Sequence, residues 1–401
     1  MRVVCVGGGP AGLYLAILTK QIDQNHEVTV LERKPKHCAD GWGVVFWDDL
    51  LADLHRTDPE TARRVTESAF RWQGQDLVLN GERVPHEGGG YGIARSTLLN
   101  ILAQRATEVG VDLRFDHEVA SPSELDADVV VASHGVNGVV RQSAEEAFGT
   151  QVVAGRNTYV WLGTDKVFDT FTFAFEKTPA GWIWFHAYAF DCGVSTCIIE
   201  CAPETRERLG LDTLSTPDSL ARLETIFARH LEGGRLMSPG PADAPLPWLN
   251  FKRVTNERWH TGNTVLVGDA AHTTHFSIGS GTRLALEDSI ALANAFKHEA
   301  TPQLAFAAYE KLRRAELAPT QHEARLSAQW FEQVDRYAGL PAPAFFALLR
   351  ARRDPLLPHV PPTLYYRLYA PLHRNRALRA VRQRARPAAA ALSSRLHRGA
   401  R

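Results

Sequence analysis

The spacing of hydrophobic residues in the first thirty positions alternates between strand and helix periods. Arg2–Val6 and Glu27–Leu31 are short β-branched runs of the kind found in buried strands. Between them, Leu13, Ala16 and Ile17 recur at helical spacing. The order strand, helix, strand predicts the start of a doubly wound α/β domain. The same texture continues with a helix and two strands, predicted at Ser96–Val109, Asp112–Phe115 and Asp128–Ala132.

The pattern changes after Arg156, where β-branched and aromatic residues become frequent in short runs. Thr178–Gly181 has the composition of a turn between two such runs. We therefore expect a mostly antiparallel sheet with strands at Thr158–Gly163, Thr170–Glu176, Trp182–Tyr188 and Ser195–Glu200. The pattern of alternating strands and helices returns with a strand and two helices, predicted at Thr264–Val267, Gly281–Phe296 and Pro302–Trp330.

These textures divide the chain into three parts. Residues 1–155 and 256–300 are predicted to form a discontinuous, Rossmann-like domain. Residues 156–255 form a mostly antiparallel β-sheet domain that is inserted into the first. Residues 301–401 form a helical C-terminal region with a basic tail. The predicted fold class is therefore α/β.

A glycine motif marks the first turn. Gly7, Gly9 and Gly12 form G-x-G-x-x-G between the first strand and the first helix. In such a motif the glycines allow a tight turn, a close approach of the pyrophosphate and close packing of the helix on the strand. The pyrophosphate lies at the helix N-terminus, where free N–H groups and the helix dipole favour negative charge. Glu32 ends the second strand and is placed to accept hydrogen bonds from ribose hydroxyls.

Both FAD and NAD use the first glycine motif, so that motif alone does not distinguish them. A second glycine element indicates which of the two cofactors binds. Gly268 and Asp269 follow a predicted strand, and Gly279 and Gly281 open the next helix. This arrangement offers Asp269 to a ribityl hydroxyl and points another helix N-terminus at the flavin end of the cofactor. A simple NAD dehydrogenase needs no such second element. The sequence therefore predicts FAD.

Composition and charge restrict the partners. The 401 residues carry 45 Lys and Arg against 45 Asp and Glu, which does not indicate a nucleic-acid binder. Residues 341–401 nevertheless hold 13 arginines and one acid, Asp354. Five cysteines without a CxxC pair indicate neither a disulfide framework nor a zinc site, so we expect a cytoplasmic protein without a metal. No apolar run approaches the roughly 20 residues of a membrane span.

Together these motifs resemble the single-component FAD-dependent aromatic hydroxylases of the p-hydroxybenzoate hydroxylase type. A second motif of that family matches Asp128–Arg141, with His134 in place of the family's aspartate. The third motif matches Gly268–Gly281, with Phe276 where the family usually has proline. Arg95 matches the arginine that contacts FAD in the family.

A narrower resemblance covers roughly residues 1–335. The segments Gly41–Val45, Gly155–Tyr159, Trp161–Thr164 and His275–Thr282 are similar to salicylyl-CoA 5-hydroxylase, anthraniloyl-CoA monooxygenase and the tryptophan-type hydroxylase of violacein biosynthesis. The stretch after Lys166 favours the aryl-CoA members.

The resemblance implies a monooxygenase in which NADH or NADPH reduces noncovalent FAD and O2 then gives a C4a-hydroperoxyflavin. An electron-rich aromatic ring attacks its distal oxygen, and the protein excludes water and holds the ring in reach. A salicylyl-CoA thioester hydroxylated at C5 is the favoured substrate. Anthraniloyl-CoA, a tryptophan-like compound and another natural-product aromatic are the alternatives. The Arg-rich segment Arg374–Arg386 either binds CoA phosphates, forms a solvated basic helix or contacts a second subunit in a homodimer.

Site residues follow from these motifs and the resemblance. His275 and His186 are the candidate catalytic residues, with a structural histidine as the alternative for His186; His272 is expected to support the loop. The predicted cofactor contacts are Gly7, Gly9, Pro10, Ala11, Gly12, Glu32, Arg33, Trp42, Val44, Arg95, Gly268, Asp269, Gly279, Gly281 and Thr282. The predicted substrate contacts are Phe173, Trp184, Tyr188 and Phe276, with sheet core as the alternative for each aromatic residue.

Two other functions compete. A flavin halogenase would carry Trp-x-Trp-x-Ile-Pro, whereas this chain has Trp182-Ile183-Trp184-Phe185-His186-Ala187 and lacks the Ile-Pro. A non-enzymatic FAD-binding redox module would not need the predicted aromatic sheet. Consumption of NADH with an aromatic substrate distinguishes this module from a hydroxylase.

Overall fold

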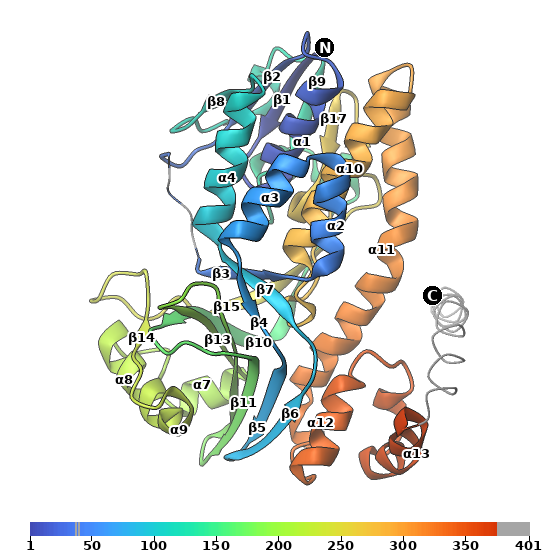
Figure 1. Cartoon of the computed structure of the whole chain (residues 1–401). Coiled ribbons are helices and arrows are strands. Elements are labelled where there is room, and N and C mark those ends of the chain that lie inside the picture. The colour runs from blue at the N-terminus through green and yellow to red at the C-terminus, as the bar shows by residue number, and fades with distance from the viewer. Residues whose placement is uncertain (37, 39–40, 375–401) are drawn as a thin grey trace.

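The computed structural model describes residues 1–36, 38 and 41–374. Figure 1 shows a parallel sheet in the upper part of the molecule and a larger, mostly antiparallel sheet below it, with the long helix α11 (Pro302–Glu332) running beside both. The C-terminal helices α12 (Ala342–Arg350) and α13 (Pro362–Arg374) lie at the lower end of α11. The segment Arg374–Arg386 lies outside the described residues except for the backbone of Arg374.

The parallel sheet has the strand order of a Rossmann-like domain. Its strands run in the order β16, β17, β9, β1, β2, β8, and all neighbours are parallel except the β16–β17 pair. The structure confirms the predicted first strands, because β1 and β2 pair from Arg2↔Glu27 to Val6↔Leu31. The bounds are β1 (Arg2–Val6), β2 (Glu27–Leu31), β8 (Asp112–Arg114), β9 (Val129–Ala132), β16 (His260–Thr261) and β17 (Thr264–Leu266).

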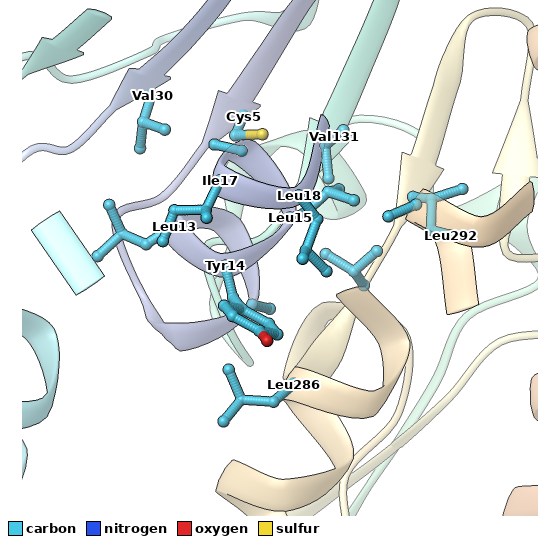
Figure 2. Close-up of a cluster of buried hydrophobic side chains, with 14 of the residues drawn as sticks. Cys5, Leu13, Tyr14, Leu15, Ile17, Leu18, Val30, Val131, Leu286 and Leu292 are labelled. Carbon is cyan, nitrogen blue, oxygen red and sulfur yellow. The ribbon is translucent and has the colours of Figure 1, made fainter. Parts of the chain in front are cut away.

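Helix α1 (Pro10–Ile22) is buried on nearly every side, which explains its almost uniformly apolar sequence. Figure 2 shows Leu13, Tyr14 and Leu15 of α1 packed between the sheet and Leu286 of α10 (Gly281–His298). Burying side chains of this size stabilises the fold by roughly 1.5–3 kcal/mol each. The tight packing fixes the N-termini of α1 and α10 relative to the carboxyl ends of the strands.

The larger sheet presents an aromatic face. Its strands run in the order β14, β10, β13, β12, β11, β5, β6, with β15 also paired to β10, and the β5–β11 pair is parallel. Cross-strand register places Phe173 opposite His186 and His186 opposite Ile198. We call this sheet the aromatic sheet. Its strands are β5 (Gln75–Leu79), β6 (Glu82–His86), β10 (Gln151–Thr164), β11 (Phe171–Thr178), β12 (Gly181–Ala189), β13 (Ser195–Cys201), β14 (Leu236–Met237) and β15 (Leu249–Thr255).

Two faces of the aromatic sheet pack on different helices. One face packs on short helices through Val160, Phe185 and Ile199. The opposite face carries Phe175 and Trp184, which pack on residues of α11 and α12. The helices beside the sheet are α7 (Pro203–Arg208), α8 (Thr216–Ile226) and α9 (Ala228–Leu231).

Part of the sequence-based division of the chain needs correction. Residues 75–86 were assigned to the Rossmann-like domain, but β5 and β6 extend the aromatic sheet. The physical reason is that Leu77 and Leu79 bury themselves against the aromatic cluster of that sheet. The other domain boundaries stay a prediction.

The remaining elements connect these layers. A small sheet has the order β3, β7, β4, with bounds β3 (Gly43–Phe46), β4 (Phe70–Trp72) and β7 (Gly90–Ala94). The other helices are α2 (Asp48–Thr57), α3 (Pro59–Ser68), α4 (Arg95–Glu108), α5 (Val139–Gln142) and α6 (Glu145–Phe148). In the part of the chain that the structure describes, no helix combines the length and hydropathy that crossing a membrane requires.

Candidate active site

A cavity of about 1040 Å³ opens at the carboxyl ends of β1, β2 and β9. In open α/β sheets this edge is where ligands bind. The N-termini of α1 and α10 both reach the cavity, through Gly9 and Pro10 and through Gly281 and Thr282. Free N–H groups of two helices therefore face one space that suits phosphate groups.

We call the turn from Gly7 to Gly12 the glycine loop. Of its three motif glycines, only Gly9 leaves room for a ligand beside the backbone. A Cβ on Gly12 would lie 2.2 Å from the Gly7 carbonyl oxygen and 2.4 Å from Ser133 Oγ. Gly7 has φ +112°, which a side chain disfavours. A Cβ on Gly9 would meet nothing nearer than the Ser133 carbonyl oxygen, at 3.8 Å. Gly7 and Gly12 thus serve the turn and its packing, whereas the space beside Gly9 belongs to the cavity.

Glu32 lies at the end of β2 with its carboxylate turned toward the glycine loop. Its Oε2 accepts a hydrogen bond from the Gly8 N–H at 2.7 Å, and its Oε1 accepts one from the Lys34 N–H at 2.9 Å. Both bonds hold the carboxylate at the wall of the cavity. Carboxylate oxygens keep further lone pairs for a donor such as a ribose hydroxyl.

Asp269 also lines this cavity. Its surface is exposed to the cavity, yet the surrounding walls desolvate the carboxylate and raise its pKa, while His272 and Arg95 act in the opposite direction. Asp269 belongs to the short helical turn η2 (Gly268–Ala270) between β17 and α10. The position of this turn decides where the Asp269 carboxylate points.

A buried ionic cluster fixes that turn. Asp288 of α10 is fully buried and accepts hydrogen bonds at Oδ2 from the Gly268 N–H (2.9 Å) and at Oδ1 from Arg313 Nε (2.8 Å). His272 Nε2 also lies 2.8 Å from Asp288 Oδ2. Burial disfavours the charge of Asp288, but His272 and Arg313 outweigh it and lower the pKa. Sequence reasoning did not identify Asp288 or Arg313.

The cavity collects most of the predicted cofactor residues but not all. The predicted residues that line it are Gly7, Gly9, Pro10, Ala11, Glu32, Arg33, Arg95, Gly268, Asp269, Gly281 and Thr282. Gly12, Trp42, Val44 and Gly279 lie outside its lining. Trp42 packs over Gly163, Val44 pairs with Ile93, and Gly279 faces Trp47.

The predicted substrate residues lie on the aromatic face. The Phe276 ring is 4.7 Å from the Tyr159 ring and 5.7 Å from the His186 ring, measured between centroids. His186 also lies 4.7 Å from Phe173. Phe276 therefore joins the loop before α10 to strands β10 and β12. We call this group, Tyr159, Phe173, His186 and Phe276, the aromatic wall.

Two predicted substrate residues of this face, Tyr188 and Trp184, form hydrogen bonds within the protein. The Tyr188 hydroxyl donates to the Gly43 carbonyl at 2.8 Å and connects β12 to β3. Trp184 donates from Nε1 to Glu200 Oε2 at 3.1 Å, and Asn157 donates to Glu200 Oε1 at 2.8 Å. Burial raises the pKa of Glu200 to about 8 despite these two bonds, so this carboxyl is largely protonated at neutral pH.

The two histidines differ in their polar contacts. Among the described residues, His186 Nε2 has no hydrogen-bond partner, and burial keeps the pKa of His186 well below its usual value. His275 Nδ1 lies 2.8 Å from Ser277 Oγ, and the His275 ring stacks on Phe276 at 4.3 Å. Burial and the charge of Arg352 lower the pKa of His275 to about 3. Both imidazoles are therefore neutral at physiological pH.

The cavity fits an extended dinucleotide. It offers two helix N-termini, a glycine turn with open space beside Gly9, and the two carboxylates of Glu32 and Asp269. It also lies in one molecule with a sheet face lined by aromatic side chains. Fold and site together define a protein that binds a dinucleotide such as FAD.

Comparison with known proteins identifies the family. Residues 1–318 match the family described as FAD binding domain. The chain is 35% identical over 362 residues to salicyloyl-CoA 5-hydroxylase of Streptomyces sp, covering 86% of this chain and 68% of the relative. The chain belongs to the FAD-dependent aromatic hydroxylases. It is a monooxygenase with FAD as cofactor, and NAD(P)H is the co-substrate typical of this family.

Other relatives share the fold or the family. The chain is 35% identical over 337 residues to 3-hydroxy-4-methyl-anthranilyl-[aryl-carrier protein] 5-monooxygenase of Streptosporangium sibiricum, covering 83% of this chain and 90% of the relative. It is 31% identical over 366 residues to protodeoxyviolaceinate monooxygenase of Chromobacterium violaceum, covering 89% and 96%. The crystal structure of 2-methyl-3-hydroxypyridine-5-carboxylic acid oxygenase matches with a TM-score of 0.69 at 20% identity, covering 85% and 94%. This last similarity shows the fold.

The first prediction concerns Glu32. Glu32→Ala removes a charged acceptor from the cavity wall and also frees the Gly8 N–H. Hydrogen bonds to charged groups contribute about 1.5–3 kcal/mol, so we expect roughly ten- to hundredfold weaker FAD binding. Titration of the apoprotein with FAD measures the affinity. Glu27→Ala, an exposed change on the same strand, is the control. Equal affinities in both variants would reject the role of Glu32.

Proposed function

We propose that this enzyme hydroxylates the aromatic ring of an acyl thioester, with salicylyl-CoA attacked at C5 as the favoured substrate. The single most informative observation is the aromatic wall, which includes a residue of the loop before α10, in a chain 35% identical to a salicyloyl-CoA 5-hydroxylase. A ring hydroxyl donates electron density to the position para to itself, which is C5 of the salicylyl ring. A thioester on an aryl-carrier protein is the second candidate, favoured by the equally similar anthranilyl relative.

The cofactor contacts are part of this proposal. The N-termini of α1 and α10 bind the negatively charged and polar groups along FAD. Glu32 accepts from the adenosine ribose, and Asp269 accepts from the ribityl chain. When bound, FAD supplies the transfer of electrons from NAD(P)H and the activation of O2. The Asp288 cluster keeps Asp269 in position through Gly268 and His272.

The aromatic wall positions the substrate and excludes water. Its rings offer flat apolar surfaces against which an aryl ring packs. Phe276 and His275 come from the loop directly before α10, the helix whose N-terminus lines the cofactor cavity. The Phe276 ring also contacts Tyr159 and His186 of the aromatic sheet. We assign a polar substituent of the ring to His186 Nε2, which has no hydrogen-bond partner in the part of the chain that the structure describes. Holding the ring in place makes the reaction effectively unimolecular.

A comparison of substrates tests the thioester. If the CoA part is a recognition element, its binding energy helps to position the remote ring. We therefore expect kcat/KM for salicylyl-CoA to exceed that for free salicylate by about a hundredfold or more. Anthraniloyl-CoA, an aryl-carrier-protein thioester and tryptophan complete the series, with NAD(P)H oxidation and product mass as readouts. Coupled hydroxylation of a free acid or an indole, without turnover of any thioester, would reject the proposal.

A second test concerns His275. Its ring stacks on Phe276 and contacts Phe251 at 4.9 Å, so His275→Ala loosens the wall beside the cofactor. We expect FAD to stay bound while the peroxide released per NAD(P)H rises severalfold, because water reaches the reacting oxygen species. His298→Ala replaces an exposed histidine at the end of α10 and is the control. An unchanged yield of hydroxylated product per NAD(P)H would show that His275 is not needed for coupling.

A further inference from the structure

Arg352, which follows α12, reaches from the C-terminal region to the loop before α10. Its Nη2 donates to the Ser277 carbonyl at 3.0 Å, and its Nε donates to Ser327 Oγ at 2.9 Å. Its Nη1 donates to the Leu349 carbonyl at 2.9 Å. These three bonds fix the guanidinium but involve only neutral groups. Two further N–H groups of the fork are left for other acceptors.

Among the described residues, the charge of Arg352 has no counter-ion in direct contact. In the described part of the chain, no carboxylate forms an ion pair with it, whereas the adjacent Arg353 pairs with Glu323 at 3.4 Å. Burial and the charge of Arg353 lower the pKa of Arg352 to about 9, with Glu323 acting in the opposite direction. The guanidinium is therefore still positively charged at neutral pH. Taking a cation out of water without a partner costs several kcal/mol.

This cation lies against the aromatic wall. The Arg352 guanidinium carbon is 5.9 Å from the centre of the Phe173 ring, and Phe173 is 4.7 Å from His186. The Arg352 charge contributes to keeping both His186 and His275 neutral. The unpartnered His186 Nε2 and the uncompensated guanidinium therefore flank the same aromatic surface.

We propose that Arg352 is the counter-ion for an oxyanion on the aromatic substrate, so that the site prefers an ionised ring hydroxyl or a carboxylate to a neutral ring amine. The inference rests on the proposed function for the place of the ring, and it deepens that function by separating hydroxyaryl from aminoaryl substrates. An oxyanion restores charge balance and accepts from the remaining N–H groups. An amine does neither.

Ligand binding to the oxidised holoenzyme tests this without turnover. The probe is salicylyl-CoA labelled with ¹³C at the hydroxyl-bearing carbon, whose chemical shift reports ionisation of the hydroxyl. In the wild type we expect ionisation at a pH at least one unit below that of the free ligand, a tenfold shift in the equilibrium. Arg352→Gln should abolish the shift and weaken binding of salicylyl-CoA about ten- to hundredfold. Binding of anthraniloyl-CoA should change by less than threefold.

Controls keep the result interpretable. Arg353→Gln removes the same charge from the next residue, which is ion-paired, and should behave as wild type. Arg352→Lys retains the charge and should retain part of the shift; FAD content verifies that each variant is folded. Arg352-dependent binding of free salicylate without binding of thioesters would support a carboxylate as the oxyanion and reject the thioester. An unshifted hydroxyl in the wild type, or equal losses for both thioesters in Arg352→Gln, would overturn the inference. Failure of the wild type to bind any of these ligands would overturn it together with the proposed function.

Discussion

Replacing Gly9 with alanine should remove FAD from a protein that still folds. Gly9 has an ordinary extended backbone (φ −76°, ψ 177°). The atom nearest to an added methyl group would be the Ser133 carbonyl oxygen, at 3.8 Å. The fold therefore tolerates alanine. The methyl group instead occupies the space at the N-terminus of α1, where the backbone must approach the pyrophosphate closely.

Gly12→Ala, in the same motif, should give the opposite outcome, a destabilised fold. Its Cβ would lie 2.2 Å from the Gly7 carbonyl oxygen, and overpacking a rigid core costs about 1–3 kcal/mol or more. Thermal unfolding of the apoproteins and titration with FAD separate the two effects. Gly193→Ala, with no atom within 4 Å of the added methyl, is the control. Wild-type FAD affinity in Gly9→Ala would contradict the assignment of the cavity to the pyrophosphate.

Asp288→Ala should destabilise the protein by about 3–5 kcal/mol, the usual cost of removing one partner from a buried ion pair. The change leaves the buried Arg313 guanidinium without the fully buried one of its carboxylate partners and the Gly268 N–H without an acceptor. FAD affinity should fall as well, because the turn that carries Asp269 loses its anchor. Chemical denaturation of the holoenzyme and of the apoprotein measures both contributions.

The loss of stability caused by Asp288→Ala should depend on pH in a defined direction. The pKa of Asp288 is lowered in the folded state, so its contribution to stability is present in full above the ordinary aspartate pKa of about 4. It is lost as the pH falls through the lower, folded-state pKa. The difference between wild type and Asp288→Ala should therefore shrink only below about pH 4. Asp49→Ala breaks an exposed ion pair with Arg283 and should cost less than about 1 kcal/mol. A comparable loss in both variants would contradict the special role of the buried cluster.

The sequence predicted those features that depend on local patterns. The strands at Arg2–Val6 and Glu27–Leu31 have the predicted bounds, because a continuous β-branched run between turn residues has one favourable conformation. The glycine motif led directly to the cavity because its geometry depends on residues close together in the chain. Alternating aromatic residues likewise predicted the mostly antiparallel sheet.

Features that depend on distant segments escaped prediction. Gln75–Leu79 is a short strand with only three apolar residues. Its partner, β11, lies almost a hundred residues further on, and nothing local specifies that pairing. Arg352 and Ser327 form part of no motif, yet packing of the C-terminal region brings them to Ser277. Tyr188 is a residue that the sequence did single out, as a substrate contact. Its hydroxyl, however, already donates a hydrogen bond to the Gly43 carbonyl. Sequence shows which groups are polar, but only the packed chain shows which of them still lack a partner.

The cofactor cavity is lined by residues from Val6 to Ala285, and this separation affects how the protein is made. The glycine loop leaves the ribosome long before β17 and α10. Until they follow, the parallel sheet of the newly made N-terminal half lacks β16 and β17. Contacts between distant segments form slowly because long loops must close first. Since FAD binds the completed cavity, it favours the folded chain by mass action. The yield of folded enzyme should therefore depend on the flavin supply of the cell that produces it.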